Sequence, residues 1–247
     1  MSQPAVETQL LTRRFGSFTA VDKVTLSISA GETFGFLGAN GAGKTTTIRM
    51  LCGLLLPTEG EGMVAGLDVF SQSEQIKRSI GYMSQKFSLY SDLTGRENLN
   101  FYGAAYGLSR SHTRERINDL SDRLELAEFL DRPSKSLPTG WRQRLALGAA
   151  LLHEPRILFL DEPTGGVDPI FRRKFWSLLY DLAEEEVTIF VTTHYMDEAE
   201  YCDRISIMHQ GRIVEMGKPF EIVAAHDEAN LEDTFISLIS GRENVDA

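Results

Sequence analysis

Hydrophobic and polar positions alternate along the first third of the chain in short runs that are separated by turn residues. The runs at 6–11 and 24–28 predict a small antiparallel region, and the run at 33–37 predicts a buried strand. A helix is predicted over 45–56, with its buried face at Ile48, Leu51 and Leu55. The predicted order is therefore strand, glycine-rich loop, helix.

Between residues 86 and 136 the pattern changes to helical periodicity, and no convincing strand is found. The periodic apolar positions are Ile117, Leu120, Leu124, Ala127 and Leu130. Pro133 ends this pattern, because proline cannot continue a helix. The interpretation is a helical insertion.

Strand-like and helical patterns alternate after this insertion. Runs at 157–160 and 187–191 predict strands, and Asp168 followed by Pro169 predicts the start of the helix between them. The apolar face of that helix comprises Phe171, Phe175, Leu178, Leu179 and Leu182. This alternation predicts a parallel sheet covered by helices, and therefore an α/β fold.

The domain organisation follows from these patterns. A terminal hairpin is predicted with strands at 204–208 and 213–216. One domain of 247 residues is expected. Its parts are a β region and core at 1–85 and 145–218, a helical subdomain at about 86–144, and a helical tail at 219–247.

Composition narrows the class of protein. A hydrophobic content of 42% and a charged content of 24% are typical of a globular domain, and no apolar run is long enough to span a bilayer. The net charge of −10 argues against a protein that binds nucleic-acid phosphates. Cys52 and Cys202 are expected to be reduced thiols, because the sequence has no export signal.

The segment 38–45 reads Gly-Ala-Asn-Gly-Ala-Gly-Lys-Thr, which is the phosphate-loop pattern. Glycines allow the unusual dihedral angles that bring backbone N–H groups close to phosphate oxygens. Lys44 would neutralise the β- and γ-phosphates, and the Thr45 hydroxyl would bind Mg²⁺. The alternative is a simple glycine-rich turn, which the position between a strand and a helix disfavours.

Two carboxylates, Asp161 and Glu162, follow the predicted strand at 157–160. Ligands of open parallel sheets bind at this end of the strands. Asp161 would hold the Mg²⁺ shell, and Glu162 would orient and deprotonate the attacking water. Adjacent acids alone usually form a solvated turn, so this interpretation depends on the phosphate loop before them.

Together with residues 137–143 and with His194 after a strand, these motifs resemble the ABC (ATP-binding cassette) ATPases. The resemblance covers residues 8–217, and the long interval between Lys44 and Asp161 leaves room for the helical subdomain of that family. It implies a P-loop NTPase with a RecA-like parallel core and an antiparallel β region. Variants at 83–90, 137–144 and 161–168 resemble those of bacterial ABC-2-type exporter ATPases.

The resemblance also implies roles for individual residues. The nucleotide-binding set is Phe15, Gly38, Asn40, Gly41, Gly43, Lys44, Thr45, Thr46, Thr139, Gly140 and Asp168. The catalytic set is Glu162, His194, Lys44 and Gln85, and the Mg²⁺ ligands are Thr45, Gln85 and Asp161. Phe15 would stack on adenine, and Phe87, Leu89 and Tyr90 would contact a membrane partner. Alternatives are a core position for Phe15, a surface amide for Gln85, a packed loop histidine for His194 and only a helix cap for Asp168.

One motif departs from the family pattern. The usual signature is Leu-Ser-Gly-Gly-Gln, but here Pro138, Thr139 and Trp141 replace its serine, first glycine and glutamine. Proline offers neither a hydroxyl nor a backbone N–H to a phosphate. Gly140 and the following helix N-terminus remain, and the Thr139 hydroxyl could substitute.

The resemblance implies ATP and Mg²⁺ as ligands, and two protein partners. These are a second cassette, identical or paralogous, and a separate transmembrane permease. The chain would lie at the cytoplasmic face of a membrane, which it would touch only through the permease, with no nucleic-acid partner. The expected function is an exporter ATPase. Two alternatives are a non-transport ABC ATPase and a regulatory nucleotide-binding module, the latter motivated by Pro138.

Overall fold

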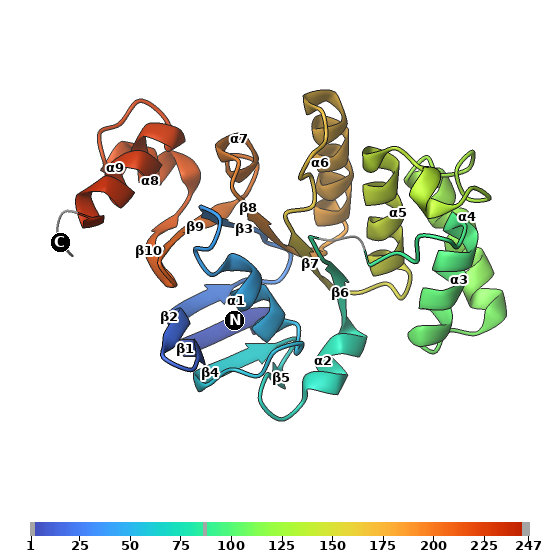
Figure 1. The fold of residues 1–247 in the computed structure, drawn as a ribbon, viewed down its shortest axis with the longest axis horizontal. Helices are drawn as coiled ribbons and strands as arrows, with labels where there is room; N and C mark the ends of the chain where they lie inside the picture. Colours follow the sequence, from blue (N-terminus) through green and yellow to red (C-terminus); the bar gives the residue numbers. More distant parts are fainter. Residues whose placement is uncertain (1–2, 86–87, 244–247) are drawn as a thin grey trace.

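Two sheets form the centre of the molecule (Figure 1). The computed structural model describes residues 3–85 and 88–243. An antiparallel sheet, in the order β2-β1-β4-β5, contains β1 (Val6–Phe15), β2 (Phe18–Ile28), β4 (Glu59–Val64) and β5 (Leu67–Asp68). A six-stranded sheet, in the order β10-β9-β3-β8-β7-β6, contains β3 (Thr33–Gly38), β6 (Ile80–Met83), β7 (Ile157–Asp161), β8 (Thr188–Thr193), β9 (Arg204–His209) and β10 (Arg212–Gly217). This architecture confirms the predicted α/β class.

Helix α1 (Lys44–Leu51) packs with both sheets into one hydrophobic cluster. Phe190 of β8 is its centre, with ring centroids 5.4 Å from Phe36 and 5.4 Å from Phe159. The opposite face of the large sheet is also buried, under helix α6 (Pro169–Glu184). Burial on both faces explains why these strands read as continuous apolar runs.

The predicted helix over 45–56 is too long, because α1 ends at Leu51. The N–H of Leu54 bonds back to the carbonyl of Arg49, which closes the helix with a tight turn. Leu55 therefore lies in the following loop, where it packs partly buried against the core. The apolar spacing continued past the real helix end.

The segment between β6 and β7 is helical, as expected, and lies at one end of the molecule (Figure 1). Its elements are α3 (Gly95–Ala105), α4 (Arg110–Arg123), the 3₁₀ turn at Ser134–Ser136 and α5 (Thr139–Leu151). The predicted pattern from Ile117 to Leu130 was wrong as a single helix, because α4 ends at Arg123 and Glu125 takes a φ of 56°. Leu124 and Leu130 are buried, but Ala127 is exposed.

Three short helices and the terminal hairpin complete the chain. They are α2 (Ser73–Ser79), α7 (Met196–Ala199) and α8 (Pro219–Ala225), and a longer α9 (Leu231–Glu243) follows. Strands β9 and β10 form the predicted hairpin around Gln210 and Gly211, with φ of 46° and 82°. Across the described ranges, no helix is both long and apolar enough to cross a bilayer.

Candidate active site

Four neighbouring strands bring the predicted motifs to one edge of the large sheet. Strands β3, β8, β7 and β6 are parallel to one another, so their carboxyl ends lie on the same side. The phosphate loop follows β3, His194 follows β8, Glu162 follows β7, and Gln85 follows β6. Ligands of open parallel sheets bind at this edge.

The phosphate loop closes around its own lysine. The Lys44 ammonium donates to the carbonyls of Gly38 at 2.7 Å and Ala39 at 3.1 Å. Gly43 has a φ of 109°, and a β-carbon there would come within 2.6 Å of the Ala20 carbonyl oxygen. Only glycine fits this position, which directs the chain into the N-terminus of α1, where an anion is favoured.

The Glu162 carboxylate is the centre of the site. Its Oε1 lies 3.2 Å from the Lys44 ammonium, and its Oε2 accepts a hydrogen bond from the Gln85 amide at 3.0 Å. His194 Nδ1 lies 3.2 Å from the same Oε2, within ion-pair distance but without hydrogen-bond geometry. Glu162 takes a φ of 50°, a strained conformation that is concentrated at functional sites.

Asp161 is fully buried beside Glu162. Its Oδ1 accepts hydrogen bonds from Thr45 at 3.1 Å and from Thr192 at 2.8 Å. Its Oδ2 is buried and has no hydrogen bond within the described residues. Burial raises the pKa of Asp161, although the two hydroxyls oppose this shift.

This unpaired oxygen next to a threonine hydroxyl fits a Mg²⁺ ion, which prefers oxygen ligands. In the described part of the chain, no three side chains of His, Cys, Asp or Glu gather as a complete metal site. Such an ion would therefore need water and phosphate oxygens beside Asp161 and Thr45. The Gln85 amide donates to Glu162, so its expected contact with the metal stays a prediction.

The signature residues lie apart from the phosphate loop in this chain. Helix α5, which begins at Thr139, groups with α3 and α4, away from α1 (Figure 1). Pro138 occupies the N-cap without a side-chain cap, and the Thr139 hydroxyl accepts from Arg142 at 3.3 Å. Gly140 is buried against Phe171.

The other expected nucleotide residues are mostly exposed. Phe15 is 46% exposed and has the Arg13 guanidinium 4.4 Å from its ring centre, so it is not a core residue.

Asp168 caps α6 by accepting hydrogen bonds from the N–H groups of Ile170 and Phe171, both at 3.0 Å. Asn40 and Gly41 are exposed in the loop, and Thr46 is half-buried in α1. Their contacts with a nucleotide stay predictions.

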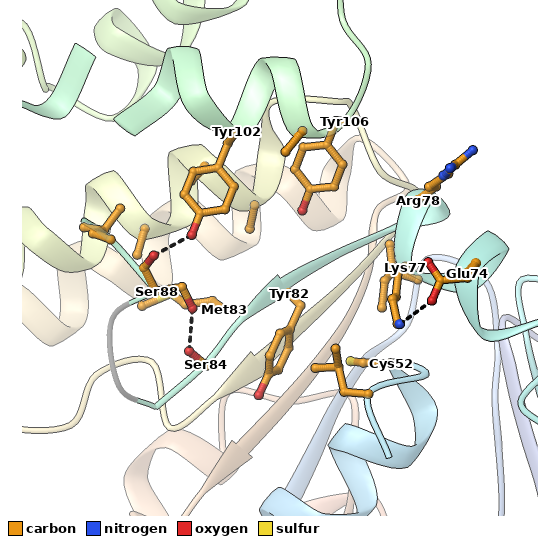
Figure 2. Close-up of a pocket in the computed structure, with 17 residues that line it drawn as sticks. Cys52, Glu74, Lys77, Arg78, Tyr82, Met83, Ser84, Ser88, Tyr102 and Tyr106 are labelled. Carbon is orange, nitrogen blue, oxygen red and sulfur yellow. Dashed lines mark hydrogen bonds and ion pairs between the residues drawn. The ribbon is translucent and has the colours of Figure 1, made fainter. Parts of the chain in front are cut away.

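A groove of about 420 Å³ lies beside the site, between β6, α2, α3 and α5 (Figure 2). Tyr102 reaches it from α3, Tyr106 from the C-cap of α3, and Tyr82 from β6. Burial raises the pKa of Tyr82 to about 12. Leu89 lines the groove, whereas Tyr90 packs on Phe101 with ring centroids 4.6 Å apart, and the expected contacts of both with a membrane partner stay predictions. Phe87 lies outside the described residues.

Sequence analysis missed Thr192. The predicted strand ended at Val191, but β8 continues to Thr193. The Thr192 hydroxyl donates to Asp161 and accepts from the Glu162 N–H at 3.0 Å, so it joins the two carboxylates to the neighbouring strand. Two β-branched threonines after an apolar run were the available signal.

The comparisons with known proteins agree with this geometry. The model of the family described as "ABC transporter" matches residues 21–165. The chain belongs to the ABC transporter family. It is 46% identical over 242 residues to the ABC transporter ATP-binding protein YbhF of Escherichia coli, a match that covers 96% of this chain and 42% of YbhF. The chain thus spans about two-fifths of the length of that relative.

Other ABC transporter proteins are similar over most of their own length. The Nod factor export ATP-binding protein I of Ralstonia nicotianae is 37% identical, with 90% of this chain and 70% of that protein covered. The dimeric structure of a bacterial ABC transporter cassette superposes with a TM-score of 0.80 at 28% identity, covering 86% of this chain and 98% of that one. These matches confirm the resemblance and the fold class.

Proposed function

We propose that the chain binds MgATP and hydrolyses it to power an exporter. The convergence of Lys44, Gln85 and His194 on the Glu162 carboxylate is the observation that carries this proposal. This convergence supports Glu162 as the general base, Lys44 as the cation that neutralises the phosphates and Gln85 as the amide that orients the water, because all of them lie at one sheet edge. If residues 38–45 were only a glycine-rich turn and residues 161–162 only a solvated acidic turn, the side chains of the two segments would not be expected to meet.

In the proposed reaction, Glu162 accepts a proton from the water that attacks the γ-phosphate. Lys44 neutralises phosphate charge, and Gln85 and His194 hold the water and the γ-phosphate in line. A bound Mg²⁺ would supply further positive charge for the phosphate oxygens from its place at Asp161 and Thr45. The strand ends already bring these groups together, so the proposed reaction requires only local rearrangement of their side chains.

The proposed partners are a second cassette and a transmembrane permease, which would keep the chain at the cytoplasmic face of the membrane. The second cassette is supported by the position of α5 away from α1 (Figure 1), and by the dimeric form of a similar cassette. The permease is supported by the groove next to Gln85, whose floor is formed by small residues of α5. Export is supported by the name of the Ralstonia nicotianae relative.

The test compares Glu162→Gln, which keeps the shape of the base, with Lys44→Ala, which removes the phosphate-binding cation. We expect Glu162→Gln to bind ATP, to lower kcat by about 10²- to 10⁴-fold, and to accumulate as an ATP-dependent dimer in size-exclusion chromatography. Lys44→Ala should lose ATP binding, and with it the dimer. Turnover that survives in Glu162→Gln would contradict the assignment of the base.

Pro138 favours one second candidate, a regulatory nucleotide-binding module. Its position at the N-cap of α5 leaves that helix end without a hydroxyl and with one N–H fewer for a phosphate. The Pro138→Ser variant decides between the two functions. If only this variant hydrolyses ATP, the regulatory module is the better conclusion, and if the wild type already does so, the exporter ATPase stands.

A further inference from the structure

A third carboxylate, that of Glu198, accepts hydrogen bonds from a threonine at the end of β8 and from a threonine in the turn after β7. The Glu198 side chain is in the short helix α7 and is fully buried. Its Oε2 accepts a hydrogen bond from the Thr193 hydroxyl at 2.6 Å, and its Oε1 accepts one from the Thr164 hydroxyl. Hydrogen bonds to a buried carboxylate are stronger than hydrogen bonds between neutral groups, so this carboxylate holds the end of β8 and the turn after β7 together.

The two threonines are neighbours of the two residues that face each other in the site. Thr193 directly precedes His194, and Thr164 follows Glu162 by two positions. His194 Nδ1 and Glu162 Oε2 are 3.2 Å apart. Glu198 therefore links the chain segment that carries His194 to the segment that carries Glu162.

The third contact of Glu198 extends this link to helix α6. Arg172 Nε lies 3.5 Å from Glu198 Oε1, and the Arg172 guanidinium also pairs with Asp197 at 3.1 Å. The Arg172 N–H bonds to the carbonyl of Asp168, the residue that caps α6. The buried negative charge is therefore balanced by a cation from the helix that begins at Asp168.

We propose that Glu198 is a positioning residue for ATP hydrolysis, which sets the distance between Glu162 and His194 through Thr164 and Thr193. This inference rests on the proposed function, since it concerns the rate of the same reaction. The Glu198 side chain contacts Thr164, Thr193 and Arg172, and the proposal gives it no direct contact with the reacting groups. Its loss should therefore change the rate of turnover while leaving nucleotide affinity, which depends on the phosphate loop, nearly intact.

The experiment uses valine, which has the shape of threonine without the hydroxyl. Thr193→Val and Thr164→Val should each lower kcat by about 10- to 100-fold, because small displacements of catalytic groups are costly, while KM for ATP changes by less than about threefold. Thr193→Ser and Thr164→Ser keep the hydroxyl and should restore most of kcat. Glu198→Gln should behave like the valine variants, because a neutral amide cannot accept from both hydroxyls and pair with the cation.

Thr8→Val is the matched control. Thr8 is also buried, donates to the Val24 carbonyl and accepts from the Leu26 N–H, both at 3.1 Å, but it lies in the antiparallel sheet. We expect it to lower the Tm as the other valine variants do, with kcat unchanged. If Thr193→Val does not fold, Glu198→Gln supplies the same comparison.

The outcomes separate this inference from the proposed function. Folded valine and Gln variants with wild-type kcat would overturn the role of Glu198 and leave the ATPase assignment intact. Variants that raise KM at unchanged kcat would overturn it equally, because the carboxylate would then act on binding. A wild-type chain without turnover that depends on Glu162 would overturn both.

Discussion

Replacing Gly140 by alanine tests why glycine is present at this position. Glycine is required there either for close packing or for contact with a nucleotide. A β-carbon there would lie 2.4 Å from two ring carbons of Phe171. The ring has little room to move, because Trp141 meets it edge-on with centroids 5.4 Å apart and the Arg144 guanidinium lies 5.1 Å from its centre. Overpacking of this kind costs about 1–3 kcal/mol of unfolding free energy. For a chain of this length, that lowers the Tm by about 2–12 °C.

The assay is thermal unfolding followed by circular dichroism, together with ATP binding. Gly165→Ala is the control, since a β-carbon at Gly165 meets nothing closer than 3.4 Å. The double variant Gly140→Ala with Phe171→Leu should recover part of the lost Tm, because leucine removes the ring that clashes. A Gly140→Ala variant with the wild-type Tm would refute the packing argument and leave phosphate contact as the reason for glycine.

Three further outcomes can be checked on the same chain. Asp161→Asn should stabilise the protein at neutral pH and abolish stabilisation by MgATP relative to ATP alone. The pKa of Asp161 is raised in the folded state, so the folded state binds more protons than the unfolded state. The unfolding free energy of the wild type should therefore fall as pH rises above about 4. This dependence on pH should be weaker in Asp161→Asn. Phe15→Ala should weaken ATP binding by about tenfold in a fluorescent-nucleotide titration, and Phe15→Tyr should not. Burial raises the pKa of both Cys52 and Cys202, so a thiol reagent at pH 8 should label them slowly in the folded chain and rapidly in urea.

Much of the fold could be predicted because its signals are local. The strands of the large sheet are buried on both faces, so apolar runs mark them, and the cap and proline at Asp168 and Pro169 mark the start of α6. Helix ends were less predictable. Leu55 and Leu130 lie in loops but also pack into the core, so the apolar spacing continues past the ends of α1 and α4. Periodicity therefore could not show where these helices end.

Periodicity and spacing alone predict two separate motifs, and only the family resemblance joined Lys44, Gln85, Glu162 and His194 into one catalytic set. Lys44 and Glu162 meet because β8 lies between β3 and β7, and Thr192 lies opposite Asp161 in that register. A strand that is buried on both faces has a continuous apolar sequence. This pattern does not indicate which strand lies next to it in the sheet. Glu198 was missed for a related reason, because a carboxylate in a short helix resembles a surface residue until the fold buries it.

Strand β6 and the residues directly after it contribute to both the groove and the site. Movement in the groove could therefore be transmitted to the Glu162 carboxylate. Strand β6 and the residues after it contribute Tyr82, Met83 and Ser84 to the groove, and Gln85 then binds the Glu162 carboxylate. A partner segment that displaces this stretch would therefore move Gln85, and with it the hydrogen bond to the base. Phosphate binding acts from the other side, because a second anion at Lys44 competes for the ammonium that Glu162 holds at 3.2 Å. If the proposed nucleotide and permease act in this way, both would move the Glu162 carboxylate.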